Sequence, residues 1–419
     1  AIGVIGPTRM NYSRIIPMPE DSMSPSVSQE RTTPLHRDPN LLIIFGITLM
    51  AVLGVSSITP AFPEIGRAFH LSSQAVANLI TVFTLPGVFL APLVGLLVDR
   101  WGREPILVPA LIIFGLAGSA CALTQSFVVL LILRFAQGVG ASALSVLYLT
   151  LIGDLYCGQE RAAAMGYNAS VLSVGTAFYP AIGGALTALG WQYPFVLAIL
   201  AIPLACIVLV ALENPEPDRE QKLGAYVSQA WESVKHVRAI ILFVLTLLAF
   251  FIIYGAYLAY LPFLMERSFQ ASSWEIGLSM SAMSLATAVT SSQLGTLAGW
   301  LGEKMLLQLA CVCYAFSLVT MPLSPSLAVL FVPVVLLGIG QGLSIPSLQT
   351  LLASRAPLEH RGAFMAVNGV ALRLGQTLGP MLMGVVHSRW GVDGTFYAAA
   401  WVAVGMLGLT TIMRSRGEG

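Results

Sequence analysis

Two arginines, Arg134 and Arg373, lie inside long apolar stretches of the sequence. A charged group is expensive in the middle of a bilayer and is usually kept there for function. Arginine does not lose its proton in proteins, so both residues supply a fixed positive charge. Arg373 precedes Gln376 by one helical turn, so these two side chains share a face. We expect both arginines to border a substrate cavity rather than to act as structural clamps on backbone carbonyls or a buried tyrosine.

Other polar and aromatic residues of the apolar stretches are further candidates for substrate binding. They are Asn78, Gln137, Gln341, Tyr254 and Tyr257. Tyr254, Tyr257 and Tyr260 recur every three residues, and they offer either stacking faces in a cavity or an aromatic belt at the membrane surface. We assign Tyr260 to the belt and leave both interpretations open for the other two tyrosines.

The sequence offers no constellation for covalent or metal chemistry. Its five histidines are scattered, mostly near loops, and its five cysteines do not have the spacing of a zinc site. A nucleotide-binding loop of the Gly-x-x-x-x-Gly-Lys-Ser/Thr type is also missing. We therefore expect no enzyme activity, no metal, no cofactor and no ATP drive. The net charge of +1 suggests no nucleic-acid partner.

The elements that must position these side chains are membrane-spanning helices. The 419 residues are 56% hydrophobic and 10% charged, whereas soluble proteins carry roughly 25% charged residues. A helix needs about 20 apolar residues to cross the hydrocarbon core. The predicted spans are 41–62, 75–98, 106–124, 128–152, 162–188, 193–212, 239–264, 274–300, 304–322, 326–352, 362–387 and 391–413. The predicted connections between spans are mostly very short, so they leave no room for a soluble catalytic domain.

The sequence also repeats itself imperfectly after 200 positions, so that Gly95 and Gly102 return as Gly295 and Gly302. Two similar six-helix halves are typical of secondary transporters. In these proteins the halves are related by an axis along the membrane normal and hold the substrate between them, near the middle of the bilayer. We predict an all-α membrane protein of about twelve transmembrane helices in two pseudo-symmetric six-helix bundles.

The basic residues set the orientation. Of the 21 lysines and arginines, only Arg67, Arg267 and Arg389 fall in predicted outer loops, and an excess of positive charge marks the cytoplasmic side. We expect both termini in the cytoplasm and a multi-pass protein of the plasma membrane, which is the inner membrane in a bacterium. The predicted divisions are a disordered cytoplasmic tail at 1–38, a first bundle at 39–212, a cytoplasmic linker at 213–238, a second bundle at 239–413 and a cytoplasmic tail at 414–419.

The loop between the second and third spans carries the clearest motif. It reads Gly95-Leu-Leu-Val-Asp99-Arg100-Trp-Gly102-Arg103. This run resembles the signature loop of the major facilitator superfamily, Gly-x-x-x-Asp-Arg-x-Gly-Arg-Arg/Lys, and it stands at the same place in the chain. The resemblance implies the two-bundle fold of that superfamily.

We expect this loop to form a conformational gate on the inner side. Asp99 can face a helix N-terminus of the other half, where the helix dipole favours an anion. Arg103 can pair with Asp154, the one carboxylate at the cytoplasmic end of the fourth span. Such contacts would hold one conformation and break in the other. The loop departs from the superfamily at Glu104, and its second-half copy has Gly299 in place of the aspartate.

Two further motifs narrow the resemblance. Residues 133–142 contain Arg134-x-x-Gln137-Gly138-x-Gly140, which resembles the helix-four motif of the superfamily. Residues 175–184 resemble the helix-five motif of its 12-helix drug/proton antiporters, Gly-x-x-x-Gly-Pro-x-x-Gly-Gly, with Tyr179 in place of the glycine before proline. The helix-packing residues predicted from this motif and its second-half copy are Gly175, Pro180, Gly183, Gly184, Gly375, Gly379 and Pro380. In efflux members of the superfamily, the helix-four arginine is associated with proton coupling.

The resemblance covers residues 41–413 and implies a secondary active transporter that moves a small molecule by alternating access. We expect a proton-coupled exporter that works as a monomer in the lipid bilayer. Many exporters of cationic drugs carry an acid inside the membrane, but here no acid lies in the middle of a span, and Glu64 only reaches the end of the first one. Two arginines without such an acid favour an anionic or neutral substrate. An importer or exchanger of organic anions and a membrane sensor that does not transport remain as alternatives.

Overall fold

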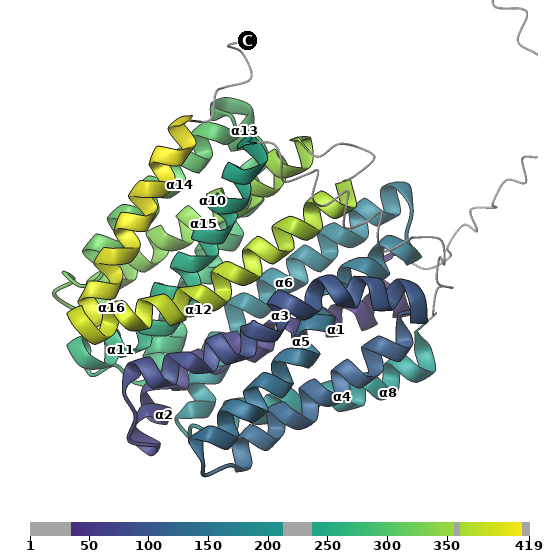
Figure 1. Ribbon diagram of the computed structural model, residues 1–419, viewed down its shortest axis with the longest axis horizontal. Helices are drawn as coiled ribbons and strands as arrows, with labels where there is room; N and C mark the ends of the chain where they lie inside the picture. The colour runs from purple at the N-terminus through teal and green to yellow at the C-terminus, as the bar shows by residue number, and fades with distance from the viewer. Residues whose placement is uncertain (1–34, 213–236, 356–360, 413–419) are drawn as a thin grey trace, which may run out of the picture.

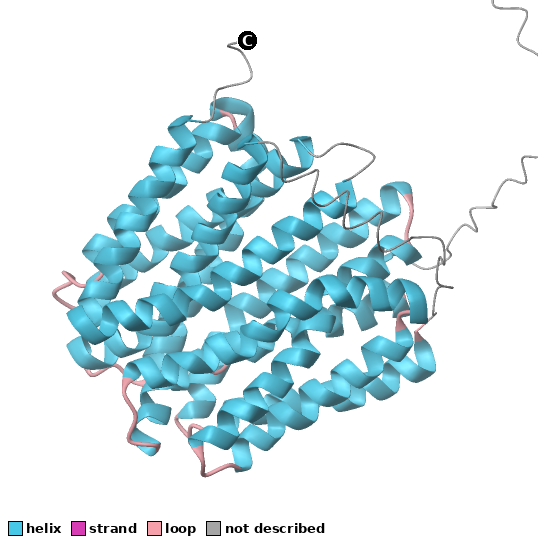
Figure 2. Cartoon of the chain, viewed as in Figure 1, coloured by secondary structure: helices cyan, strands magenta, loops and turns pink. Residues whose placement is uncertain are grey.

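The structure is a computed structural model that describes residues 35–212, 237–355 and 361–412. Within these ranges the chain forms helices joined by short loops and turns, with no strand (Figure 2). Residues 1–34 of the predicted first tail, 213–236 of the predicted linker and 413–419 at the end of the chain lie outside the described ranges. The predicted all-α class is confirmed.

Six spans make up the first half, and the first and sixth of them are broken into shorter helices. After a short turn, η2 (Leu35–Arg37), the helices are α1 (Pro39–Ser56), η3 (Thr59–Ala61), α2 (Phe62–Ala68), α3 (Ser73–Trp101), α4 (Glu104–Ala120), η4 (Cys121–Leu123), α5 (Phe127–Leu155), α6 (Gly158–Thr187), α7 (Tyr193–Val196), η5 (Leu197–Leu200) and α8 (Ala201–Ala211). The break in the first span coincides with Pro60 and Pro63, because proline cannot donate the backbone hydrogen bond that a helix interior requires.

The second half repeats this order. Its helices are α10 (Val237–Ile252), the π-helix η6 (Ile253–Leu258), α11 (Ala259–Phe269), α12 (Ser273–Ser292), α13 (Leu294–Leu301), α14 (Glu303–Thr320), α15 (Leu327–Arg355) and α16 (Arg361–Ile412). α16 contains the last two predicted spans, which meet at Gly391, where φ is 70°. The six predicted spans of this half therefore all coincide with helices.

Ten helical stretches of the described chain are long and apolar enough to cross a membrane. One of them, Phe364–Ile412, contains two of our spans. The eighth predicted span is not among the ten, because α12 is rich in serine and threonine. Polar residues are tolerated there because α12 packs along α6 of the first half instead of standing free in lipid.

Local signals at the helix ends agree with the 200-residue repeat. α3 begins after Ser72, whose hydroxyl accepts from the backbone N–H of Ala75, and α12 begins after Ser272, which forms a capping box with Glu275. α3 ends at Gly102 with φ of 91°, and α13 ends at Gly302 with φ of 75°. These positive φ angles explain why glycine stands at both repeat-related positions.

The helices form two bundles that meet along two pairs of helices. α1 to α8 pack mainly among themselves, as do α10 to α16 (Figure 1). Across the interface α3 packs against α16 and α6 packs against α12. Under the repeat, α3 corresponds to α12 and α6 to the first part of α16, so the interface has an approximate twofold relationship.

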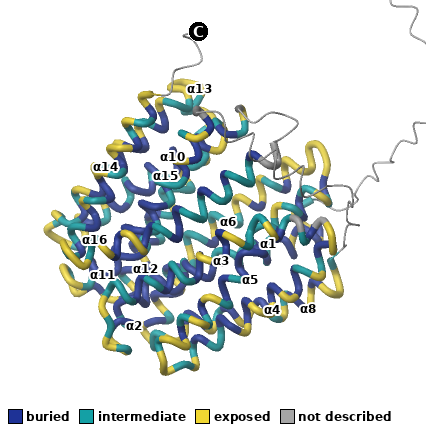
Figure 3. Tube along the Cα trace, viewed as in Figure 1, coloured by how far each residue is buried: buried dark blue, intermediate teal, exposed yellow. Residues whose placement is uncertain are grey.

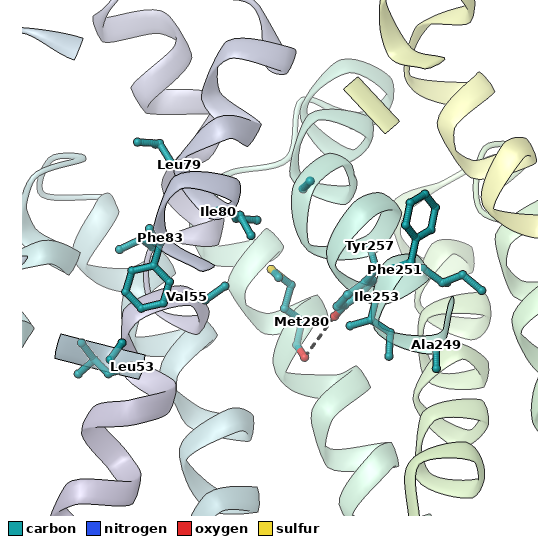
Figure 4. Packing of buried hydrophobic residues seen from close by; sticks show 14 of the residues in the cluster. Leu53, Val55, Leu79, Ile80, Phe83, Ala249, Phe251, Ile253, Tyr257 and Met280 are labelled. Atoms are coloured by element: carbon teal, nitrogen blue, oxygen red, sulfur yellow. Dashed lines mark hydrogen bonds between the residues drawn. The ribbon is translucent and has the colours of Figure 1, made fainter. Parts of the chain in front are cut away.

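Buried apolar side chains form one large cluster that extends through both bundles. Figure 4 shows part of it, with Phe83 of α3 on one side and Met280 of α12 on the other. Large apolar side chains are also exposed on the outside of the helices, among them Val210 of α8 and Phe316 of α14. The exposed segments follow the periphery and the ends of the helices (Figure 3). An apolar periphery of this kind suits a protein whose solvent is lipid.

Candidate functional site

Arg134 is held within the first bundle. It lies on α5 and is completely inaccessible, at 0% exposure. Its Nη1 donates to Oε1 of Gln137 at 2.6 Å, its Nε donates to the carbonyl of Leu79 on α3 at 3.4 Å, and its Cζ lies 4.2 Å from the ring centroid of Phe83. Nη2 has no hydrogen-bond partner. These contacts tie α5 to α3, and Gln137 takes part in them through Oε1.

Arg373 lies where the two bundles meet. Its side chain on α16 is only partly buried, and its Nη1 donates to Oε1 of Gln376 at 3.0 Å. The stem crosses α3 at Gly87, where an added Cβ would lie 3.2 Å from Cδ of the arginine. Glycine at that position leaves the room that the arginine occupies. None of the ion pairs among the described residues includes Arg373 or Arg134.

Two tyrosines from different bundles lie within electrostatic range of Arg373. Tyr148 of α5 and Tyr254 of η6 both lie close enough to its guanidinium to interact with it electrostatically, and both side chains are partly accessible. Tyr148 was missed at the level of sequence, although it follows Arg134 on the same helix by fourteen positions, close to four turns, and therefore shares its face.

Directly beside this group, a hydrogen bond crosses the interface. The hydroxyl of Thr377 on α16 donates to the hydroxyl of Thr84 on α3 at 3.0 Å, and both threonines are buried. Thr84 was also missed, because a single threonine in an apolar span does not reveal which helix it faces.

The second and third tyrosines of the seventh span are buried inside the protein. Tyr257 is buried, and its hydroxyl donates to the carbonyl of Met280 on α12 at 3.4 Å (Figure 4). Tyr260 is also completely buried and packs against His387, with ring centroids 5.0 Å apart, so its assignment to the aromatic belt is wrong. The π-helix η6 contributes to this difference, because its wider turn changes the directions in which successive side chains point.

The remaining polar candidates lie apart from Arg373 in the contacts that the structure records. Gln341 of α15 accepts from Thr287 of α12 at 3.5 Å, a contact within the second bundle. Asn78 of α3 is partly buried. Glu64 does not reach the interior, because it lies on α2 and pairs with Arg67 at 2.7 Å.

The signature loop places one ion pair as the sequence predicted. Nε of Arg103 donates to Oδ2 of Asp154 at 2.8 Å, and the side chain of Arg103 is nearly buried. Arg100 is exposed near the end of α3. The side chain of Asp99 lies outside what the structure describes, so its contact with the other half stays a prediction.

Contacts between the bundles gather at the end opposite this loop. Arg67 of α2 lies 3.3 Å from a carboxylate oxygen of Glu266 on α11, and both helices lie at that end of the molecule (Figure 1). The hydroxyl of Ser281 on α12 accepts from the backbone N–H of Ala181 on α6 at 3.1 Å. Gly184 of α6 meets the backbone of Ser273.

Near the signature loop, three glycines have open space where a side chain would begin. A Cβ added at Gly95 of α3 would meet no atom within 4 Å, and the same holds for Gly295 and Gly299 of α13. Among the described residues, the contacts given above therefore join the bundles at the Arg67 end, and these three glycines have no neighbour that an added Cβ would meet.

The glycines and prolines predicted to pack helices lie at close contacts. Gly255 of η6 and Gly379 of α16 approach so closely that a Cβ on the former would lie 2.8 Å from a backbone atom of the latter. Gly375 meets the backbone of Leu247, and Gly183 meets that of Ser57. Two further contacts involve Gly175, which lies against Leu49, and Pro180, whose carbonyl faces Gly277. Pro380 is buried in α16, next to Gly379.

The chain is similar to a known family and to several curated proteins, and these similarities agree with the fold. A family model described as the Major Facilitator Superfamily matches residues 44–332 and 264–418. Multidrug resistance protein 2 of Bacillus subtilis (strain 168) is 24% identical over 402 residues, which cover 94% of this chain and 98% of that protein. The class D tetracycline resistance protein of Salmonella ordonez is 25% identical over 383 residues, covering 87% and 94%.

A solved structure shares the arrangement of helices. It is a bacterial homolog of the human lysosomal transporter Spinster, in an inward-facing and occupied conformation. The TM-score is 0.74 at 18% identity, over 91% of this chain and 97% of that one.

Proposed function

This chain belongs to the Major Facilitator Superfamily, a superfamily of transporters, and from that premise we propose that it is a proton-coupled exporter of small molecules. Its relatives include proteins named for multidrug and tetracycline resistance, which supports outward transport. Proton drive follows from its resemblance to the drug/proton antiporter branch, to which those relatives belong. We propose that the protein works as a monomer, because one chain supplies both of the bundles that meet at this interface.

Transport proceeds by alternating access between the two bundles. The observation that supports this proposal is the set of contacts between the bundles at the Arg67–Glu266 end, whereas an added Cβ at Gly95, Gly295 or Gly299 meets no atom within 4 Å among the described residues. With the termini in the cytoplasm, this arrangement is an inward-facing state. Rocking about the α3–α16 and α6–α12 contacts then exposes the space around Arg373 to the other side.

In this cycle the Arg103–Asp154 pair belongs to the inner gate. It holds the start of α4 against the end of α5, which fixes the signature loop on the first bundle. In the outward-facing state the loop meets the second bundle through Asp99, and in the inward-facing state that contact breaks.

Flux measurements on purified protein test the proposal. Proteoliposomes are prepared with an acidic lumen, and the accumulation of labelled tetracycline and 1-naphthoate is followed with and without a protonophore. We expect accumulation of at least one compound, which the protonophore abolishes. Accumulation that is the same with and without the protonophore would exclude proton coupling. If folded, reconstituted protein accumulates neither compound, the exporter proposal is wrong for these classes of molecule.

A further inference from the structure

The two membrane arginines differ in how their charges are compensated. Every acidic residue of the sequence lies near the end of a span or outside the spans, so neither arginine has a carboxylate at its own depth. An uncompensated charge in a low-dielectric interior costs several kcal/mol, by order of magnitude. Something else must therefore stabilise each arginine.

Protein groups supply that stabilisation to Arg134. A backbone carbonyl, an amide oxygen and an aromatic ring face surround it, and its exposure of 0% leaves no path for a ligand. Its contacts all lie within α3 and α5, so they would persist if the bundles moved relative to one another. These features are those of an internal clamp.

Among the described residues, Arg373 makes one hydrogen bond, whereas Arg134 makes two. The bond of Arg373 goes to Gln376, one turn further along the same helix, and part of the Arg373 side chain is accessible. A guanidinium group carries five N–H donors in a planar fork, so several donors remain for a partner. Gly87 of α3 lies against its stem and has no side chain to displace it, and the tyrosines Tyr148 and Tyr254 lie within electrostatic range of its guanidinium.

We propose, on the premise that the chain is a transporter, that Arg373, Tyr148 and Tyr254 form a site for an organic anion, a carboxylate attached to an aromatic body. The carboxylate lies in the fork of Arg373, which offers two parallel charge-assisted hydrogen bonds. The tyrosine rings pack against the aromatic body, and their hydroxyls can donate to the carboxylate. Arg134 does not touch the substrate.

The position of the site couples binding to the conformational cycle. Tyr148 and Gly87 belong to the first bundle, whereas Arg373 and Tyr254 belong to the second. A ligand that contacts both bundles binds the states differently, because rocking changes the distances across the interface. Such differential affinity is what allows a ligand to shift a conformational equilibrium.

Three probes with the same ring system test the charge preference. They are 1-naphthoate, the neutral 1-naphthamide and the cation 1-naphthylmethylammonium, each titrated into purified protein in detergent while the melting temperature and the heat of binding are recorded. We expect 1-naphthoate to bind and raise the melting temperature, since a ligand of the native state stabilises it. Equal or tighter binding of the amide or the cation would overturn the proposal.

Variants then locate the site. Arg373→Lys keeps the charge but loses the fork, and we expect it to weaken 1-naphthoate binding about tenfold, whereas Arg373→Gln loses about a hundredfold. Tyr148→Phe and Tyr254→Phe weaken binding by severalfold each. Arg389→Gln, the same substitution at an exposed position of α16, is the matched control and leaves affinity unchanged.

Arg134→Gln tests whether Arg134 has a structural role and Arg373 alone binds the anion. We expect it to lower the melting temperature while the affinity per folded molecule stays the same. If Arg134→Gln abolishes binding in folded protein and Arg373→Gln does not, the assignment of roles is reversed and our proposal is wrong.

Binding of 1-naphthoate tests the anion site, and flux tests the exporter, so the two proposals can be refuted separately. Proton-driven transport of tetracycline without any binding of 1-naphthoate refutes the anion site and leaves the exporter. Arg373-dependent binding of 1-naphthoate without flux of either compound keeps the site and refutes the exporter.

Discussion

The hydroxyl of Thr377 on α16 donates a 3.0 Å hydrogen bond to the hydroxyl of Thr84 on α3, and this bond joins the two bundles inside the apolar interface. Arg373 stands one turn before Thr377, and Gly87 nearly one turn after Thr84. The bond therefore sets the spacing of α3 and α16 beside the proposed anion site.

Thr377→Val removes the donor of this bond and keeps the branched shape. We expect the conformation described here to lose about 0.5–1.5 kcal/mol, the usual net contribution of a hydrogen bond, relative to the state open at the Arg67 end. Spin labels at Gln192→Cys and Ser388→Cys, one on each bundle near that end, report the change as a larger fraction of long distances. Thr410→Val in the last span is the control, because the hydrogen bond recorded for Thr410 lies within its own helix. Identical distance distributions for both variants would contradict a role for the Thr84–Thr377 bond.

The Arg103–Asp154 pair lends itself to a double-mutant cycle. Asp154→Ala leaves a nearly buried guanidinium without its carboxylate, so we expect a clear fall in melting temperature. Arg103→Ala/Asp154→Ala should recover part of the loss, with a coupling energy of about 1–3 kcal/mol. Additive losses in thermal unfolding would mean that the pair contributes nothing to stability.

Asp99→Asn tests whether Asp99 takes part in the conformational gate at the signature loop. We expect transport to fall more than the amount of folded protein, because the change weakens a contact made in one conformation alone. Flux per folded molecule is the quantity to compare, with Glu104→Gln in the same loop as the control. Full flux by Asp99→Asn at normal protein level would remove Asp99 from the gate.

The positions of the helices along the chain were predictable from sequence, but the directions that their side chains face were not. Eleven of the twelve spans follow from apolar length, and the eighth span and the turn at Gly302 follow from the repeat. In the sequence, Arg134 and Arg373 cannot be distinguished, because each is an arginine inside an apolar span. They differ because Phe83 and Leu79 of a neighbouring helix surround the first, whereas Gly87 leaves the second accessible. Such differences depend on how helices rotate and pair in three dimensions.

The burial of Tyr260 has a similar origin. A spacing of three residues in a regular helix places three tyrosines along one slowly turning stripe. The π-helix at Ile253–Leu258 interrupts that regularity, and the final tyrosine packs against His387 instead of facing the membrane surface. The spacing of side chains does not reveal such an interruption.

Cysteine labelling tests the orientation of the chain. In a background with the exposed native cysteines Cys157 and Cys206 changed to serine, we expect Gln192→Cys to react with an impermeant maleimide from outside the cell. Gln221→Cys, in the linker predicted from sequence, should react only after the membrane is opened. The reverse pattern would place both termini outside and contradict the positive-inside assignment.

Gly184 tests the closed end of the interface directly. An alanine there would drive its Cβ into the backbone of Ser273 on α12, and backbone cannot move aside as a side chain can. We expect Gly184→Ala to push α6 and α12 apart at the Arg67 end, destabilising the described conformation by about 1–3 kcal/mol, as overpacking does. The Gln192–Ser388 spin-label distance should lengthen, and flux should fall. Gly166→Ala is the matched control on the same helix, because a Cβ there meets no atom within 4 Å, and alanine favours the helix. If Gly184→Ala resembles Gly166→Ala in distance, flux and melting temperature, the close approach of α6 and α12 does not hold this end shut.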